Sequence, residues 1–313
     1  MPLDPALGAM LEMVAAAGAP ALHEVDVPTG RAIYLQMTYG ERAPEQVVPV
    51  ASTEDRMLPG AKRQLHARVY RPEAADDAAL PTVVFFHGGG WVIGDLNTHD
   101  NMARHICHHS QAVVVSVDYR LAPENPYPAA VEDAVFVTRW VSQNLAEFGC
   151  SSVCAVAGDS AGGNLSAIAA QAMHSEGVQL CAQFLIYPSV DLASDAYPSR
   201  RENAEGYFLE QKTMEWFVTK YLSEQDDPRH PHISPLRAAS LAGLPPALIV
   251  TAEYDPLRDE GRAYAEALQQ AGVAAELMPV AGMIHGFYDM GGVSPAAKQA
   301  IVQGCTRFGQ MLR

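Results

Sequence analysis

One short segment of the chain has the residue types that nucleophilic catalysis needs. Residues 158–162 read Gly-Asp-Ser-Ala-Gly, which is a G-x-S-x-G pattern. The apolar run 153–157 before it is typical of a strand, and the residues from Ala161 onward are typical of a helix. A serine on so sharp a strand-to-helix turn projects its hydroxyl above the sheet, and the amide of Ala161 at the helix N-terminus can donate to an oxyanion. The motif predicts Ser160 as a nucleophile.

A glycine-rich segment follows an earlier apolar run. Residues 87–91 read His-Gly-Gly-Gly-Trp and come directly after the run 82–86. Glycines at the end of a strand let bare backbone N–H groups approach a ligand, and a segment of this type supplies oxyanion donors. The alternative is a phosphate-binding loop, but the lysine of a P-loop and the G-x-G-x-x-G spacing are both missing. We expect an oxyanion hole at Gly88, Gly89, Gly90 and Ala161, and the sequence leaves open which two of the glycines donate.

A nucleophilic serine needs a base, and the base needs a carboxylate that orients it. After a G-x-S-x-G turn the expected order along the chain is serine, acid, histidine. Asp255 follows the apolar run 247–251, and His285 follows the run 274–280. Both residues therefore fall just after a predicted strand and in the required order. We predict Asp255 as the orienting acid and His285 as the base.

Other acidic residues and histidines lie close to these positions. His87 adjoins the glycines, and we expect it to support that loop. Asp159 adjoins the nucleophile, and we expect its side chain to point away in a structural role. Asp259 and Glu260 lie one turn beyond Asp255, and we expect them to face solvent or a neighbouring helix.

The composition restricts the class of protein. The chain has 313 residues, and 49% hydrophobic residues are enough for a large core and too many for a disordered chain. Its 21 Lys and Arg against 36 Asp and Glu give a net charge of −15, which argues against nucleic-acid partners and anionic membranes. No segment has ~18 uninterrupted apolar residues, and no cationic region precedes the first apolar run, so we expect no stable membrane association. With an odd number of cysteines, these features predict a cytoplasmic protein.

Apolar runs alternate with helical patterns over most of the chain. The runs are short, continuous and rich in β-branched residues, which is typical of strands buried on both faces in a parallel sheet. We expect an antiparallel pair at the start of the sheet, because little chain separates residue 47 from the strand at Leu65. The polar, proline-rich segment 191–235 interrupts the alternation. We predict cap helices at 1–46, core at 47–190, a cap insertion at 191–235 and core again at 236–313.

Two further groups of side chains have spacings that could serve a ligand. His105, His108 and His109 have helical spacing that can bind a metal, but a helix packed behind the sheet with partly solvated imidazoles explains them better, and we predict no metal site. Trp216, Phe217 and Tyr221 in the insertion could line a pocket or simply pack the cap, and the sequence leaves both open.

Five segments together resemble a known family. They are His-Gly-Gly-Gly-Trp at 87–91, Asp-Tyr-Arg-Leu-Ala-Pro-Glu at 118–124, Gly-Asp-Ser-Ala-Gly-Gly at 158–163, Ser-Pro-Leu at 234–236 and Asp-Pro-Leu-Arg-Asp at 255–259. In this combination the chain resembles the bacterial hormone-sensitive-lipase-like carboxylesterases. The resemblance implies an α/β-hydrolase fold, with a mostly parallel sheet of about eight strands, helices on both faces and a helical cap.

The same resemblance implies ester hydrolysis by a triad of Ser160, Asp255 and His285 without a metal or other cofactor. It also implies homodimers formed through an edge strand, which we place at 274–280. We expect a small-molecule ester of short to medium chain length as substrate. The alternatives are an amidase or deacetylase with the same triad, and a non-catalytic small-molecule receptor. Plant hormone receptors that resemble the family lack a triad member, whereas all three residues are present here.

Overall fold

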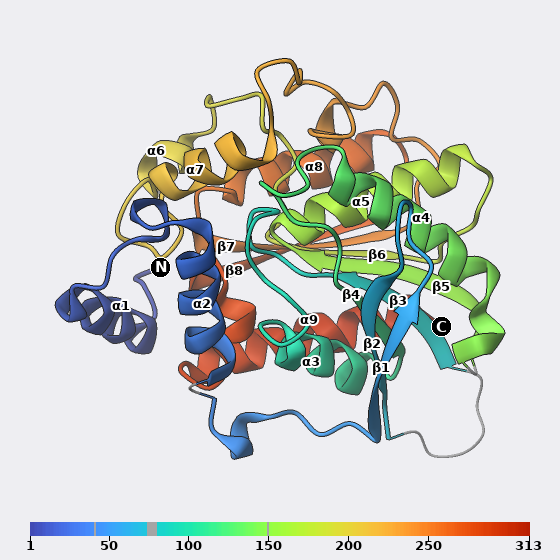
Figure 1. Ribbon diagram of the computed structural model, residues 1–313, viewed down its shortest axis with the longest axis horizontal. Helices are drawn as coiled ribbons and strands as arrows, with labels where there is room; N and C mark the ends of the chain where they lie inside the picture. Colours follow the sequence, from blue (N-terminus) through green and yellow to red (C-terminus); the bar gives the residue numbers. More distant parts are fainter. Residues whose placement is uncertain (41, 74–79, 149) are drawn as a thin grey trace.

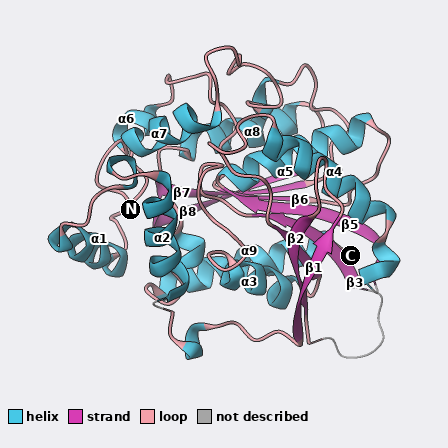
Figure 2. Ribbon diagram, viewed as in Figure 1, coloured by secondary structure: helices cyan, strands magenta, loops and turns pink. Residues whose placement is uncertain are grey.

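A twisted, mostly parallel sheet forms the centre of the protein (Figures 1 and 2). The computed structural model describes residues 1–40, 42–73, 80–148 and 150–313. Within these residues the sheet has eight strands in the order β1-β2-β4-β3-β5-β6-β7-β8. They are β1 Ser52–Leu58, β2 Leu65–Arg71, β3 Leu80–Phe86, β4 Val113–Val117, β5 Cys150–Asp159, β6 Gln183–Ile186, β7 Ala247–Tyr254 and β8 Ala275–Ile284. The pairs β1–β2 and β2–β4 are antiparallel and the other pairs are parallel, which confirms the predicted fold class.

Strand β3 shows why the central strands are continuously apolar. Val84 and Phe86 pack in one buried cluster, whereas Val83 and Phe85 pack in another. Successive side chains of a strand point to opposite faces of the sheet, so both faces of β3 are buried. A strand covered on both sides has no polar face, which is the pattern seen in the sequence.

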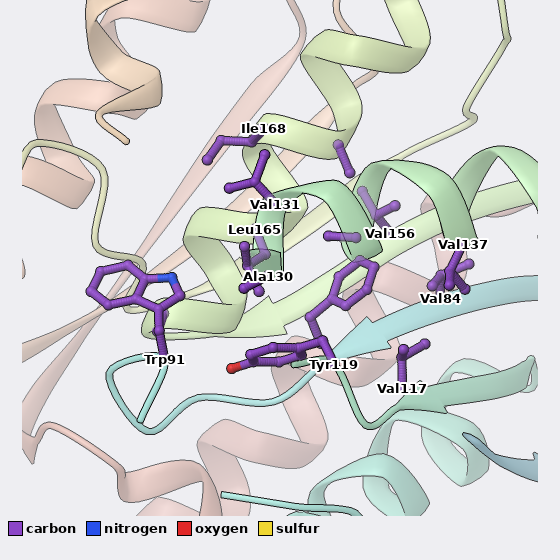
Figure 3. Close-up of a cluster of buried hydrophobic side chains, with 14 of the residues drawn as sticks. Val84, Trp91, Val117, Tyr119, Ala130, Val131, Val137, Val156, Leu165 and Ile168 are labelled. Carbon is purple, nitrogen blue, oxygen red and sulfur yellow. The ribbon is translucent and has the colours of Figure 1, made fainter. Parts of the chain in front are cut away.

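Helices cover both faces of the sheet. On one face lie α4 Ala129–Gln143, α5 Ala161–Ser175 and α8 Arg258–Gln270, and on the other lie α3 Asp100–Ser110 and α9 Pro295–Met311 (Figure 1). Figure 3 shows the first layer, in which Val131 of α4 and Leu165 of α5 lie over Val84 and Val156 of the sheet. These layers form the core that holds the strand ends in place.

Four further helices lie together over one end of the sheet (Figure 1). They are α1 Pro5–Ala17, α2 Val27–Leu35, α6 Pro198–Glu202 and α7 Gln211–Tyr221, and we call them the cap helices. The two halves of this group meet where His23 Nδ1 lies 3.0 Å from Thr213 Oγ1 of α7. The cap helices come from the segments 1–46 and 191–235, and the division into cap and core remains our interpretation.

The first helix begins at Pro5, because the Asp4 side chain accepts the amides of Ala6 and Leu7 and caps the helix. By length and composition alone, Pro5–Glu24 is apolar enough to cross a membrane, although the sequence predicted no stable membrane association. The helix itself ends at Ala17, where Gly18 adopts a left-handed conformation. Its 13 residues span about 20 Å, less than the roughly 30 Å of a bilayer core.

Candidate active site

Ser160 stands on a strained turn between β5 and α5. Its φ of 53° and ψ of −116° lie outside the regions that ordinary residues favour. The surrounding backbone holds it there, because its N–H donates to the carbonyl of Ile186 at 2.9 Å and its own carbonyl accepts the amide of Ser189 at 3.1 Å. Gly162 is needed for the same turn, since a Cβ at this position would lie 1.9 Å from the Phe86 carbonyl oxygen. The turn therefore presents the Ser160 hydroxyl at the carboxyl end of the sheet.

The structure brings Ser160 together with Asp255 and His285, which come from the ends of β7 and β8. His285 Nε2 lies 3.0 Å from Ser160 Oγ, and His285 Nδ1 lies 2.8 Å from Asp255 Oδ2. Asp255 is fully buried, and its other oxygen accepts the amide of Leu257 at 2.8 Å. The imidazole can therefore donate from Nδ1 to the carboxylate while Nε2 accepts the serine proton.

Tyr187 is a neighbour of His285 that no sequence motif indicates. Its ring lies 4.6 Å from the His285 ring, centroid to centroid, and its side chain is almost completely buried. Its φ of 35° is positive, as in few non-glycine residues. Tyr187 directly follows β6, and only the folding of the sheet brings the end of β6 beside His285, so no sequence motif indicates this contact.

The glycine loop after β3 has two kinds of backbone amide. The amide of Gly88 donates to Asp159 Oδ1 at 2.8 Å in a buried contact and is therefore occupied. In the described part of the chain the amides of Gly89 and Gly90 have no protein acceptor, and both residues line a cavity with Ser160 and Ala161. The loop thus leaves Gly89 and Gly90 as candidate donors, and Asp159 has the structural role expected of it.

His87 supports this loop, as its position beside the glycines suggested. The side chain is fully buried, and its Nδ1 lies 2.7 Å from the Gly88 carbonyl oxygen. Tyr119 donates its hydroxyl to the His87 carbonyl at 2.8 Å, and the two rings stack at 4.4 Å. Burial, together with the nearby His99, lowers the pKa of His87 to about 4. His87 is therefore uncharged and supports the loop.

Of the two settings expected for Glu260, solvent or a neighbouring helix, the structure shows the neighbouring helix. Its side chain is fully buried, where it accepts the Val190 amide at 2.8 Å and forms an ion pair with Arg200 of α6 at 2.6 Å. Burial raises the pKa of this carboxyl even though Arg200 opposes the shift. Asp259 pairs with Arg258 at 2.8 Å. Glu260 therefore anchors a cap helix to the core, and neither residue reaches His285 in place of Asp255.

A cavity of about 650 Å³ opens above Ser160 and His285. Its walls are mainly apolar and come from the cap helices, with Leu11, Val14, Ile33, Met214 and Phe217 among the lining residues. The sequence left open whether the aromatic residues of α7 line a pocket or pack the cap, and the structure shows both. Phe217 lines the cavity and faces Gly90, whereas Tyr221 is buried and stacks on Trp91 at 4.4 Å. Trp216 packs against the core cluster.

The histidines of α3 are separated from this cavity. His105 is buried, which lowers its pKa to about 3, and His108 Nδ1 lies 3.0 Å from the Pro49 carbonyl oxygen. Among the residues that the structure describes, no three His, Cys, Asp or Glu side chains are grouped to hold a metal ion.

Comparison with known proteins places this geometry in a family. A family model described as alpha/beta hydrolase fold matches residues 83–289. The chain is 41% identical over 312 residues to the carboxylic ester hydrolase LipN of Mycobacterium tuberculosis, covering 96% of this chain and 81% of the relative. It is 38% identical over 243 residues to a protein of Pseudomonas putida named ethyl acetate hydrolase, covering 76% of each.

A solved structure agrees over almost the whole chain. The hyperthermophilic esterase from the archaeon Pyrobaculum calidifontis superposes with a TM-score of 0.94 at 41% identity, covering 99% of both chains. The match includes the cap helices as well as the sheet. The chain therefore belongs to the hormone-sensitive-lipase-like family of carboxylesterases within the α/β-hydrolase superfamily.

Proposed function

We propose that this carboxylesterase cleaves short- to medium-chain esters through a covalent acyl-enzyme on Ser160. One observation carries the proposal. The Ser160 hydroxyl lies 3.0 Å from His285 Nε2, His285 Nδ1 lies 2.8 Å from the buried Asp255, and the hydroxyl opens onto an apolar cavity. These distances are within the range needed for proton transfer from nucleophile to base.

In the first half-reaction His285 takes the proton of Ser160 as the hydroxyl oxygen attacks the ester carbonyl carbon. Asp255 keeps the proton of His285 on Nδ1 and stabilises the imidazolium that forms. The imidazolium then protonates the leaving alcohol as the carbon–oxygen bond of the ester breaks. In the second half-reaction water attacks the acyl-enzyme, with His285 again as base, and the carboxylic acid leaves.

The oxyanion of each tetrahedral intermediate needs donors on the side opposite the base. Gly89 and Gly90 have unoccupied amides, and Ala161 is the first residue of α5, where helical amides lack intrahelical acceptors. We assign the oxyanion hole to these three residues. Gly88 acts differently from our first expectation, because its amide is already bonded to Asp159. Removal of one such donor typically costs about 2.7–4 kcal/mol of transition-state stabilisation.

The walls of the cavity favour uncharged acyl chains of limited length. Apolar side chains of α1, α2 and α7 enclose it, and Glu210 and Glu215 lie among the lining residues. These carboxylates and the net charge of −15 disfavour anionic substrates. The name of the Pseudomonas putida relative, ethyl acetate hydrolase, supports a short acyl chain.

The test is hydrolysis of p-nitrophenyl esters with acyl chains of about two to sixteen carbons by the wild type and Ser160→Ala. We expect a maximum at short or medium chains and roughly a 10⁶-fold fall in kcat in the variant. Circular dichroism checks that the variant is folded. Activity of folded Ser160→Ala within tenfold of the wild type would contradict the nucleophile, and a maximum at the longest chains would contradict the chain-length assignment.

A further inference from the structure

A second histidine lies behind the oxyanion loop without reaching the cavity. His99, at the start of α3, is 2% exposed, and its Nε2 lies 3.5 Å from Asp159 Oδ2. The other oxygen of Asp159 accepts the amide of Gly88 at 2.8 Å. Imidazole, carboxylate and loop amide are thus connected in series. Gly89 and Gly90, which we assigned to the oxyanion hole, directly follow that amide.

The hydrogen bonds around His99 define which of its nitrogens carry hydrogen. The Thr98 hydroxyl donates to the Asp95 carbonyl at 2.9 Å, and it lies 2.8 Å from His99 Nδ1. A hydroxyl has a single hydrogen to donate, so the hydrogen between Thr98 and His99 comes from the imidazole. A bare Nε2 would place a lone pair against the Asp159 carboxylate. The arrangement accommodates a hydrogen on each nitrogen, and the ion pair between Nε2 and Asp159 at 3.5 Å favours the imidazolium.

The charges around His99 favour the same state. Burial alone would lower the pKa of His99, but the carboxylate of Asp159 and those of Asp289 and Asp95 outweigh it, and the pKa is raised. The other rings packed against His99 belong to Tyr34, Phe85 and His87, and His87 is held neutral. His99 is thus the cation in a buried group whose other charged members are carboxylates and Arg42, which pairs with Asp289.

We propose that His99 is a positioning residue for ester hydrolysis: its imidazolium orients Asp159, Asp159 fixes the Gly88 amide, and this fixes the directions of the Gly89 and Gly90 amides. The proposal rests on the oxyanion hole assigned above. His99 does not touch the substrate. Its contribution appears when the oxyanion forms, because only then are the two glycine amides needed.

The experiment compares three variants by kcat and KM on one p-nitrophenyl ester. We expect His99→Phe to lower kcat by about 10- to 100-fold with KM changed by less than about threefold, which is less than the 10²–10³-fold cost of deleting a donor. We expect His99→Gln, which can still donate to Asp159, to recover part of the loss. The matched control is His105→Phe, since His105 is also a buried histidine of α3, but its ring packs on His109 and makes no hydrogen bond to the loop among the described residues.

Two further readouts separate positioning from a purely structural role. In a double-mutant cycle, the effects of His99→Phe and Asp159→Asn on kcat should be strongly non-additive, because both residues act through Gly88. In the wild type, kcat should fall at alkaline pH as His99 loses its proton. This alkaline decrease should be absent in His99→Gln and unchanged in His105→Phe.

The outcomes distinguish this inference from the proposed function. If Ser160→Ala abolishes activity but His99→Phe matches His105→Phe in kcat, the positioning role is wrong and the nucleophile stands. If Ser160→Ala remains active, the proposed function fails regardless of His99. Should His99→Phe not fold, His99→Gln and the wild-type pH profile still decide the matter. An unchanged alkaline limb in His99→Gln would overturn the role of the imidazolium.

Discussion

The core and the cap contribute different things to the same cavity. Every group that we assign to the chemistry comes from the core, at the ends of β3, β5, β7 and β8. Most of the apolar wall above them comes from α1, α2 and α7. The central strands β3, β4, β6 and β7 are mostly buried, whereas α1 buries only Leu7 among its 13 residues. A rigid sheet thus fixes the reacting atoms, and a lightly packed cap forms the space for the substrate.

This division implies that mutations in different parts of the molecule should affect the rate of hydrolysis and the selectivity for the acyl chain. Catalytic groups must be held within a few tenths of an ångström, which packed strands can do. A binding wall needs only shape and an apolar surface, and elements of low local stability can supply it. Changes in the core should therefore affect kcat by orders of magnitude, whereas changes in the cap should affect the preferred chain length.

The largest effect tests the core. Asp255→Asn should lower kcat by about 10⁴-fold with little change in KM, because the amide favours the wrong imidazole tautomer. Steady-state kinetics on a short p-nitrophenyl ester measure it. Asp259→Asn, one turn further on and paired with Arg258, is the matched control and should remain within threefold of the wild type. Equal losses of kcat in the two variants would contradict the assignment of Asp255 as the acid that orients His285.

The next effect lies where core and cap meet. Gly90→Ala should lower kcat by about 10²-fold, because φ is 58° at this position and a Cβ would lie 2.2 Å from the Phe217 ring. Adding Phe217→Ala should restore part of the loss by removing the steric contact. Kinetics of the single and double variants measure the restoration. Additive effects would show that backbone strain alone causes the loss.

A smaller effect tests the cap by itself. Phe217→Ala should shift the preferred acyl chain by several carbons, with relative kcat/KM for long and short esters changing about tenfold. Trp216→Ala is the control, because Trp216 packs against the core cluster and is not among the cavity-lining residues of the described chain. Its chain-length profile should match the wild type. A shift in kcat for all esters alike would contradict the division between wall and chemistry.

Buried histidines give the core a stability that depends on pH. His105 has a folded pKa of about 3, well below the usual 6.5, so the unfolded state binds more protons between these values. Stability should therefore fall as pH drops below 6.5, by about 2 kcal/mol at pH 5 for this residue. Urea unfolding at pH 7 and pH 5 should show a smaller acid loss for His105→Phe. An equal loss in both proteins would mean that His105 is protonated in the fold.

The weakest expectation concerns assembly. β8 is an edge strand of the sheet, as expected of the segment 274–280, and the homodimer through it remains a prediction. Exposed edges with free backbone groups can pair with a second copy. Light scattering at micromolar concentration should give the mass of two chains. The mass of one chain would contradict the predicted homodimer.

The sequence predicted the fold and most of the site for a local reason. The order of apolar runs and the turn glycines are short-range signals, and Ser160, Asp255 and His285 each directly follow such a signal. His99 has no such local mark. Tyr187 directly follows β6 but no motif connects it with His285, because both contacts arise from strands and helices that meet only in three dimensions. For the same reason, the sequence could not show that the Gly88 amide is already bonded and is therefore not an oxyanion donor. Its acceptor, Asp159, lies 71 residues away along the chain.

The order of the strands also determines how much of the sheet must form before the enzyme is active. His285 stands at the end of β8, which among the described strands pairs with β7 alone and forms one edge of the sheet. Until β8 is seated, Ser160 has no base, however well the earlier strands have formed. Recovery of hydrolysis during refolding therefore requires that β8 has joined the sheet, whereas circular dichroism follows the helices and strands as a whole.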